Sequence, residues 1–261
     1  MRTTSNPAFK HLPAGGGYAN FDTGRGAFGG FGQTRSAAST RPLTIDDVVT
    51  KTATTLSLAV LTGALTYLGG SLAAGLALPA AIVGLVLSLV IIFRKKVSPA
   101  LVIAYSAVEG VFLGGISYAF TAMAGISSGV IMQAIAGTIG VFAAMLVVYK
   151  TGAIRVTPKF TKWLIGAAAG CFVLMLVNLI ASFFISGGLG LREGGALGIG
   201  FSLICIGVAA FSFLLDFDAA DRAIKGGAEA RVAWYIAFGL MTTLVWLYLE
   251  ILRLLTMLQN D

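Results

Sequence analysis

Charged residues are scarce in this chain. Asp, Glu, Lys and Arg make up 11% of its 261 residues, while apolar residues make up 57%. A soluble domain has about 25% charged residues, so this composition excludes an ordinary soluble domain and predicts a membrane protein. The net charge of +7 does not indicate nucleic-acid binding. The basic residues stand in short clusters between apolar runs, a pattern that reports membrane topology.

Histidine and cysteine are equally rare. The single histidine, His11, lies in a Gly-rich leader, and the two cysteines, Cys171 and Cys205, lie inside apolar runs. A reactive thiol needs polar, partly exposed surroundings, so we interpret both cysteines as small buried hydrophobes. P-loop, Rossmann, HExxH and GxSxG motifs are missing too. We therefore expect no enzyme, no catalytic residues, no metal centre and no resident cofactor.

The first 42 residues lack any hydrophobic period and are rich in Gly, Ala, Ser and Thr. Such a composition offers too little apolar burial to offset ordering entropy, so we predict a disordered cytoplasmic tail over residues 1–42. Residues 43–261 then form a transmembrane domain. Its first helix is expected to begin at the TIDD sequence, with Thr44 as the N-cap and acids in the first turn.

Seven apolar runs follow, each near the length of about 20 residues that a hydrocarbon core of about 30 Å requires. They predict an all-α membrane protein, a seven-transmembrane-helix bundle. Their approximate bounds are 51–70, 76–93, 98–121, 127–149, 161–186, 195–217 and 233–258.

Basic loops alternate with neutral ones along these runs. The loops after the first and third runs carry no charge, and in the loop after the fifth Arg192 and Glu193 are expected to cancel. The positive-inside rule then places the N-terminus in the cytoplasm and, with seven spans, the C-terminus outside. If the first run lies on the surface or the seventh fails to cross, both termini share one side. The basic residues used are Arg94, Lys95, Lys96, Lys150, Arg155, Lys159 and Lys162.

Ionisable residues at membrane depth are rare, and they usually face a bundle interior or an ion path. Glu109 lies near the middle of the third run, and Glu250 lies in the seventh. For Glu109 two accounts stay open: an ion or proton path, or a protonated carboxyl that hydrogen-bonds a neighbouring helix. Arg253, three residues after Glu250, is either an interfacial anchor or the counter-ion of Glu250.

Acids also end the sixth run. Asp216 and Asp218 stand about 200° apart on a helical wheel, so only one can point at the bundle axis. Asp216 is the deeper of the two and the better functional candidate, and Asp218 is the second candidate for the proton sensor or ion path at this helix end. For Asp218 and Asp221 we favour a solvated helix end, paired with the basic residues Arg222 and Lys225.

Several short motifs resemble one known family. They are a basic FRKK turn that leads into a run with AYS and GVFLGG, a sixth run that ends in acid, and a seventh that ends LYLEILRLL. Over residues 42–258 the chain is similar to the Bax inhibitor-1 (transmembrane Bax inhibitor motif) family, and SNPAF and RPLTIDDVVTKT resemble its bacterial YccA-like branch. The resemblance implies a bacterial inner-membrane protein with a central last helix. It also implies a pH-sensitive calcium leak, gated by two aspartates on the sixth and seventh helices with an arginine nearby.

The resemblance assigns roles to individual residues. Asp216 matches the acid of the sixth helix, and Arg94 is the nearest match to the arginine. Glu250 matches the acid of the seventh helix if LYLE is aligned on it, whereas an alignment on the following LLR-like tail places Thr243 there, about 10 Å away. The depth of each acid in the membrane, counted in residues along its apolar run, favours a Glu109–Glu250 pair over an Asp216–Glu250 pair. Two close carboxyls in low dielectric cannot both ionise cheaply, so either pair would sense pH.

Three functions remain open on the sequence. The first is a passive cation leak, since carboxylates supply the hard oxygen ligands that Ca²⁺ prefers. The second is a proton-coupled transporter that uses the same acids as a relay. The third is a scaffold or regulator that binds other membrane proteins, such as quality-control proteases, with the acids merely structural. The expected partners are the lipid bilayer, calcium ions or protons, and membrane proteins.

Overall fold

A computed structural model of the chain describes residues 41–94, 97–125 and 127–260. These residues form helices joined by short loops, with one antiparallel β-bridge between Pro42 and Glu229. The tail expected to be disordered lies outside the described residues up to position 40, as do Lys95 and Lys96. The helices are α1 (Ile45–Leu68), α2 (Gly70–Ala74), α3 (Ala77–Phe93), α4 (Pro99–Ala124), α5 (Gly129–Thr151), α6 (Pro158–Ser182), α7 (Ala196–Lys225), the 3₁₀ turn η2 (Ala230–Val232) and α8 (Ala233–Asn260).

Each of the seven predicted runs is a helix, which confirms the all-α, multi-pass fold. In the part of the chain that the structure describes, six helices are long and apolar enough to cross a membrane, and α3 is an apolar helix of 17 residues. At 1.5 Å per residue α3 is about 25 Å long, slightly less than a typical hydrocarbon core. The largest boundary error concerns the sixth run, whose helix continues to Lys225 instead of ending near 217. Asp216 therefore lies more than two turns inside α7.

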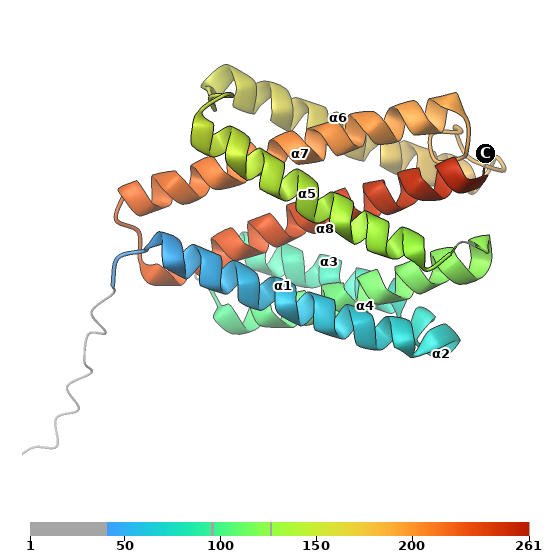
Figure 1. Ribbon diagram of the computed structural model, residues 1–261, viewed down its shortest axis with the longest axis horizontal. Coiled ribbons are helices and arrows are strands. Elements are labelled where there is room, and N and C mark those ends of the chain that lie inside the picture. Colours follow the sequence, from blue (N-terminus) through green and yellow to red (C-terminus); the bar gives the residue numbers. More distant parts are fainter. Residues whose placement is uncertain (1–40, 95–96, 126, 261) are drawn as a thin grey trace, which may run out of the picture. The chain divides into compact units, whose positions relative to one another are not determined.

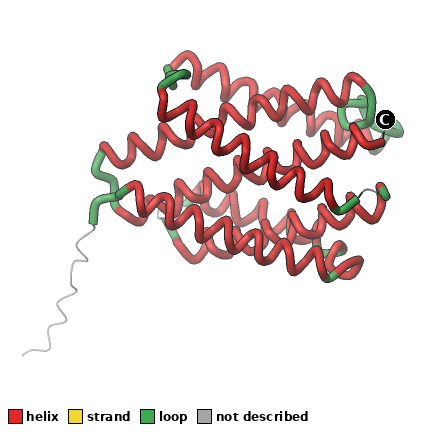
Figure 2. The backbone as a smooth tube through the Cα atoms, in the orientation of Figure 1, coloured by secondary structure: helices red, strands yellow, loops and turns green. Residues whose placement is uncertain are grey.

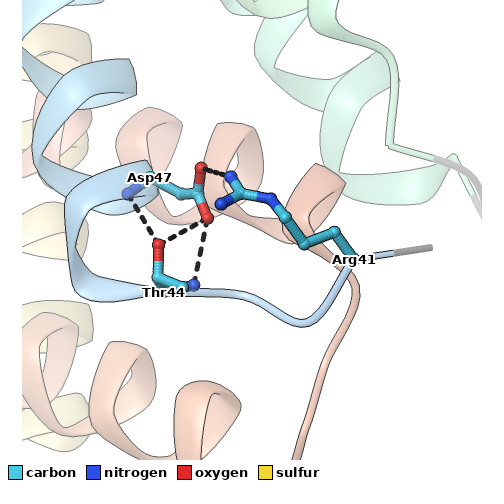
Figure 3. A network of polar contacts seen from close by, with 3 residues as sticks. All are labelled: Arg41, Thr44 and Asp47. Atoms are coloured by element: carbon cyan, nitrogen blue, oxygen red, sulfur yellow. Dashed lines mark hydrogen bonds and ion pairs between the residues drawn. The ribbon is translucent and has the colours of Figure 1, made fainter. Parts of the chain in front are cut away.

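The start of α1 is fixed by polar contacts that the sequence predicted in part. The Thr44 side chain accepts a hydrogen bond from the Asp47 amide at 3.3 Å, and the Thr44 amide donates to the Asp47 carboxylate at 3.0 Å. This reciprocal capping box satisfies amides that the first helical turn leaves without partners. Figure 3 shows Arg41 extending the network by an ion pair with Asp47.

The chain before α1 is also attached to the turn between α7 and α8. The Leu43 amide donates to the Ala228 carbonyl at 2.8 Å, and the Ala230 amide donates to the Arg41 carbonyl at 2.9 Å. The Leu43 side chain is buried in the largest apolar cluster. The segment before α1 therefore packs against the turn that leads into α8.

Helix α8 is the centre of the bundle, as the family resemblance implied. It packs against α1, α4, α5 and α7 and is the most buried of the long helices. Figure 1 shows it running between the other helices, and Figure 2 shows the loops that connect them. By contrast, α6 packs mainly against α7 and leaves much of its apolar surface exposed. A change in the position of α8 would therefore alter its packing against four neighbouring helices.

Glycines bring α1 and α4 into backbone contact. A Cβ on Gly110 would lie 2.3 Å from the Ala59 carbonyl oxygen, and one on Gly114 would lie 2.2 Å from the Gly63 carbonyl oxygen. Gly110 and Gly114 are four residues apart on α4, as are Ala59 and Gly63 on α1. This is the small-xxx-small spacing that lets helices approach closely in lipid. The Gly-rich GVFLGG stretch of α4 is therefore a helix-packing surface.

The two ends of the bundle differ in charge. The start of α1, the α5–α6 loop and the α7–α8 turn share the end on the left of Figure 1, while the α6–α7 loop lies at the other end with the last turns of α8. The left end carries most of the basic residues of the described chain. They include Arg41, Lys150, Arg155, Lys159, Arg222, Lys225 and Arg231.

Candidate functional site

Asp216 and Thr243 join α7 to the central helix. The Thr243 hydroxyl donates a hydrogen bond of 2.7 Å to Asp216 Oδ2. A Cβ on Gly239, one turn earlier on α8, would lie 3.8 Å from Asp216 Oδ1, so the small residue leaves room for the carboxylate. Asp216 is half-buried and Thr243 is buried. Asp216 thus faces the bundle interior, as its depth in the sequence suggested.

The next two acids of α7 point the other way. Asp218 pairs with Arg222 at 2.8 Å, and Asp221 pairs with Lys225 at 2.5 Å, both one helical turn apart. The basic partners are mostly exposed. These contacts confirm the interpretation of a solvated helix end. Exposed pairs of this kind contribute little to stability.

Glu250 is held in a buried ion pair that the sequence did not reveal. Its Oε1 lies 3.1 Å from Arg192 Nη2, and the residue is only 1% exposed. Arg192 comes from the α6–α7 loop, 58 residues away in the chain. Arg192 and Glu193 leave the loop without net charge, but they do not pair with each other: the loop folds back so that Arg192 reaches α8.

Arg253 supports this ion pair instead of forming it. Its Nη2 donates to the backbone carbonyl of Arg192 at 3.2 Å, which fixes the loop at the point where Arg192 turns toward Glu250. Arg253 is therefore not the counter-ion of Glu250. It is partly buried, so the alternative of an anchor that simply extends outward does not describe it either.

Glu109 lies on the other side of α8. It is 9% exposed, and its Oε1 would be 3.0 Å from a Cβ on Gly84 of α3. Tyr105, one turn earlier on the same face of α4, lies 3.3 Å from Thr242 of α8, hydroxyl to hydroxyl. A small residue on α3 and a tyrosine on α4 thus surround the carboxyl of Glu109.

The expected Glu109–Glu250 pair is not found. Within the described residues Glu250 bonds to Arg192 from the α6–α7 loop, while Glu109 faces α3. The residue of α8 that lies level with Asp216 is Thr243, seven positions before Glu250. Seven residues are two helical turns, which keep the face but shift the level by about 10 Å. Counting depth correctly separated Asp216 from Glu250, but it could not tell which side of α8 Glu109 faces.

A polar layer crosses the bundle at one level of α8. Thr242 and Thr243 are adjacent, so their side chains diverge by about 100°. Thr243 contacts Asp216 on α7, and Thr242 contacts Tyr105 on α4, with Glu109 one turn further on. We call Asp216, Thr243, Thr242, Tyr105 and Glu109 the polar layer. No cluster of three His, Cys, Asp or Glu side chains that could hold a metal ion occurs among the residues described.

Comparison with known proteins now identifies the family. A sequence profile described as Bax inhibitor 1 like matches residues 6–260. The chain belongs to the Bax inhibitor 1 like family. No curated protein sequence matches the chain.

The structure also locates the positions to which the family resemblance assigned roles. In this Bax inhibitor 1 like protein Thr243, not Glu250, faces the acid of α7. Arg94 is exposed at the C-terminal end of α3, and no ion pair joins it to Asp216 or Asp218 in the described part of the chain. The role of Arg94 as a counter-ion of these acids is therefore not supported. Cys171 and Cys205 are buried in one apolar cluster between α6 and α7, as expected.

Proposed function

We propose that this Bax inhibitor 1 like protein is a pH-sensitive cation leak, with Ca²⁺ as the ion, in the inner membrane of a bacterium. The observation that carries the proposal is the hydrogen bond from Thr243 to the carboxylate of Asp216. It ties the central helix to α7 through a group that can take up a proton. The channel class itself comes from the family resemblance.

Proton uptake would weaken this tie. A hydrogen bond to an ionised acceptor is roughly twice as strong as one between neutral groups. When Asp216 becomes neutral, the Thr243 bond loses that charge assistance. Because α8 packs against four other helices, loosening its contact with α7 changes how the whole bundle fits together. Acidification on the side of the membrane from which protons reach Asp216 is therefore expected to open the leak.

The polar layer supplies a plausible chemistry for passage of a hard cation. Ca²⁺ prefers carboxylate, hydroxyl and carbonyl oxygens at 2.3–2.6 Å. The polar layer places Asp216 and Thr243 on one side of α8, and Thr242, Tyr105 and Glu109 on the other. Intramembrane carboxylates of this kind commonly mark ion pathways.

The charge of the two ends supports an orientation. The end that holds the start of α1 and the α7–α8 turn is the basic one, so we place it in the cytoplasm. The last turn of α8 then lies outside. Asp216, about nine residues from the end of α7, is nearer to the cytoplasmic face.

The experiment is calcium flux in liposomes that contain the purified full-length protein and an enclosed calcium dye. A step from pH 8 to pH 6 should raise the rate of Ca²⁺ entry down its gradient several-fold over protein-free liposomes. Flux that is absent at both pH values overturns the leak and leaves the scaffold. Uptake against a Ca²⁺ gradient, driven by a proton gradient, overturns it in favour of the transporter.

A further inference from the structure

A cavity opens between α6 and the last turns of α8, at the end of the bundle opposite the basic loops. Its volume is about 440 Å³, within the range of about 300–1,000 Å³ typical of small-molecule sites. One wall is the C-terminal half of α6, where large apolar side chains are exposed. That wall is made by Phe172, Met175, Leu176 and Leu179.

Two guanidinium groups form the polar side of the cavity. Arg192 and Arg253 both line it, and its described lining contains no acid. Among the described residues, the only carboxylate bonded to either arginine is Glu250, which is buried behind Arg192. The other acid of the loop, Glu193, lies against Gly187. Two positive charges therefore meet one negative charge, and the excess positive charge faces the cavity.

The arginines also keep donors to spare. A guanidinium has five N–H donors, yet the hydrogen bonds of the described chain use one from Arg253, to the Arg192 carbonyl, and one from Arg192, to Glu250. Arg253 Nε is buried with no hydrogen-bond partner among the described residues. Asn178 also lines the cavity, and its Oδ1 accepts a hydrogen bond of 2.9 Å from the Leu189 amide. This bond holds the α6–α7 loop at the rim of the cavity.

We propose that this cavity binds an anionic phospholipid of the surrounding leaflet, with the phosphate on Arg192 and Arg253 and an acyl chain along α6. Charge complementarity selects the head group, because arginine forks match phosphate oxygens in paired hydrogen bonds. The exposed apolar face of α6, with Phe172 67% and Leu179 55% exposed, selects a lipid over a free anion. This site does not depend on ion conduction.

The test is native mass spectrometry of the full-length protein in detergent, titrated with phosphatidylglycerol or phosphatidylcholine. Wild type should bind the first about tenfold more tightly, because its head group has a net negative charge, whereas the choline ammonium of the second offsets the same phosphate and is repelled by the two arginines. Arg253→Gln should remove this preference. Arg155→Gln, an exposed arginine at the opposite end, should keep it. Leu176→Trp should reduce phosphatidylglycerol binding by narrowing the acyl-chain slot while both arginines stay in place.

Three results overturn the proposal. One is equal binding of the two lipids by wild type. Another is an unchanged preference in Arg253→Gln or, if that variant does not fold, unchanged binding in Leu176→Trp. The third is displacement of phosphatidylglycerol by millimolar inorganic phosphate, which would show a site for a free anion instead of a lipid. A failure of calcium flux leaves all three measurements intact.

Discussion

The Thr243 hydroxyl donates a hydrogen bond of 2.7 Å to Asp216, while Glu250, two turns further along the same face of α8, is paired with Arg192. The central helix therefore carries two polar attachments at two levels, one to α7 and one to the α6–α7 loop. The first joins a carboxylate to a neutral hydroxyl. The second is a closed ion pair. This difference is the reason for placing the pH response at Asp216.

The first prediction concerns Thr243→Val, which removes the hydroxyl but keeps the side-chain shape. The lost bond to a charged group should lower the free energy of unfolding by between about 0.6 kcal/mol, the average for hydrogen bonds in membrane helices, and about 3 kcal/mol. The pH dependence of flux should shrink with it. Thr256→Val is the matched control, since among the described residues buried Thr256 bonds only to the Leu252 carbonyl of its own helix. Equal effects of the two substitutions on flux would contradict this account of the α7–α8 contact.

The second prediction concerns the buried ion pair. Arg192→Gln leaves Glu250 buried without a counter-ion, which should destabilise the protein by about 3 kcal/mol, the lower end of the usual range because Arg192 is 34% exposed. The double variant Arg192→Gln, Glu250→Gln should recover much of this loss, because no uncompensated charge remains. Thermal unfolding in detergent measures both. A double variant no more stable than Arg192→Gln alone would show that the two residues act independently.

The third prediction concerns the α1–α4 crossing. Gly114→Ala places a methyl group 2.2 Å from the Gly63 carbonyl oxygen, so the helices must separate. Overpacking of this kind typically costs about 1–3 kcal/mol. In Gly166→Ala on α6 the new methyl meets nothing within 4 Å, and the better helix propensity of alanine should leave stability unchanged or slightly higher. The melting temperature of Gly114→Ala should therefore fall, while that of Gly166→Ala should stay unchanged or rise slightly.

The fourth prediction concerns the cap of α1. Thr44→Ala removes the side chain that accepts from the Asp47 amide, and the loss should be about 1 kcal/mol. Thr54→Ala serves as its control, because exposed Thr54 bonds only to the Thr50 carbonyl one turn earlier. Chemical or thermal unfolding that ranks the control as the more damaging substitution would contradict the importance of the capping box.

The fifth prediction concerns orientation. In a background with Cys171→Ala and Cys205→Ala, a thiol introduced by Glu193→Cys should react with a membrane-impermeant reagent applied outside intact cells. A thiol introduced by Arg155→Cys should react only after the membrane is opened. Both positions are exposed in loops at opposite ends of the bundle. The reverse labelling pattern would invert the topology.

The sequence allowed the fold to be predicted because its signals are local. Apolar length determines a membrane helix, the Thr44–Asp47 spacing determines a capping box, and a basic residue four positions after an acid determines the Asp218–Arg222 contact. Each of these depends on residues that lie within one element. The four-residue spacing of Gly110 and Gly114 is also local, whereas the choice of α1 as the partner of α4 depends on the packed structure.

The pairing of the deep acids could not be predicted, because it depends on where distant segments meet. Arg192 reaches Glu250 only since the α6–α7 loop folds back over α8, and nothing near Arg192 in the sequence reports that path. Counting residues gave the level of Glu109 but not the direction it faces. The alternative alignment on Thr243 contained the correct partner of Asp216, and only the packing of α7 on α8 distinguishes it from Glu250.

The most direct test of the central claim is the pH dependence of Ca²⁺ flux in liposomes that contain Asp216→Asn, compared with wild type and with Asp218→Asn. Asparagine keeps the shape and can still accept from Thr243, but it cannot titrate. The account predicts that flux through Asp216→Asn no longer changes between pH 8 and pH 6, while Asp218→Asn responds as wild type does. A wild-type pH response in folded Asp216→Asn would contradict it.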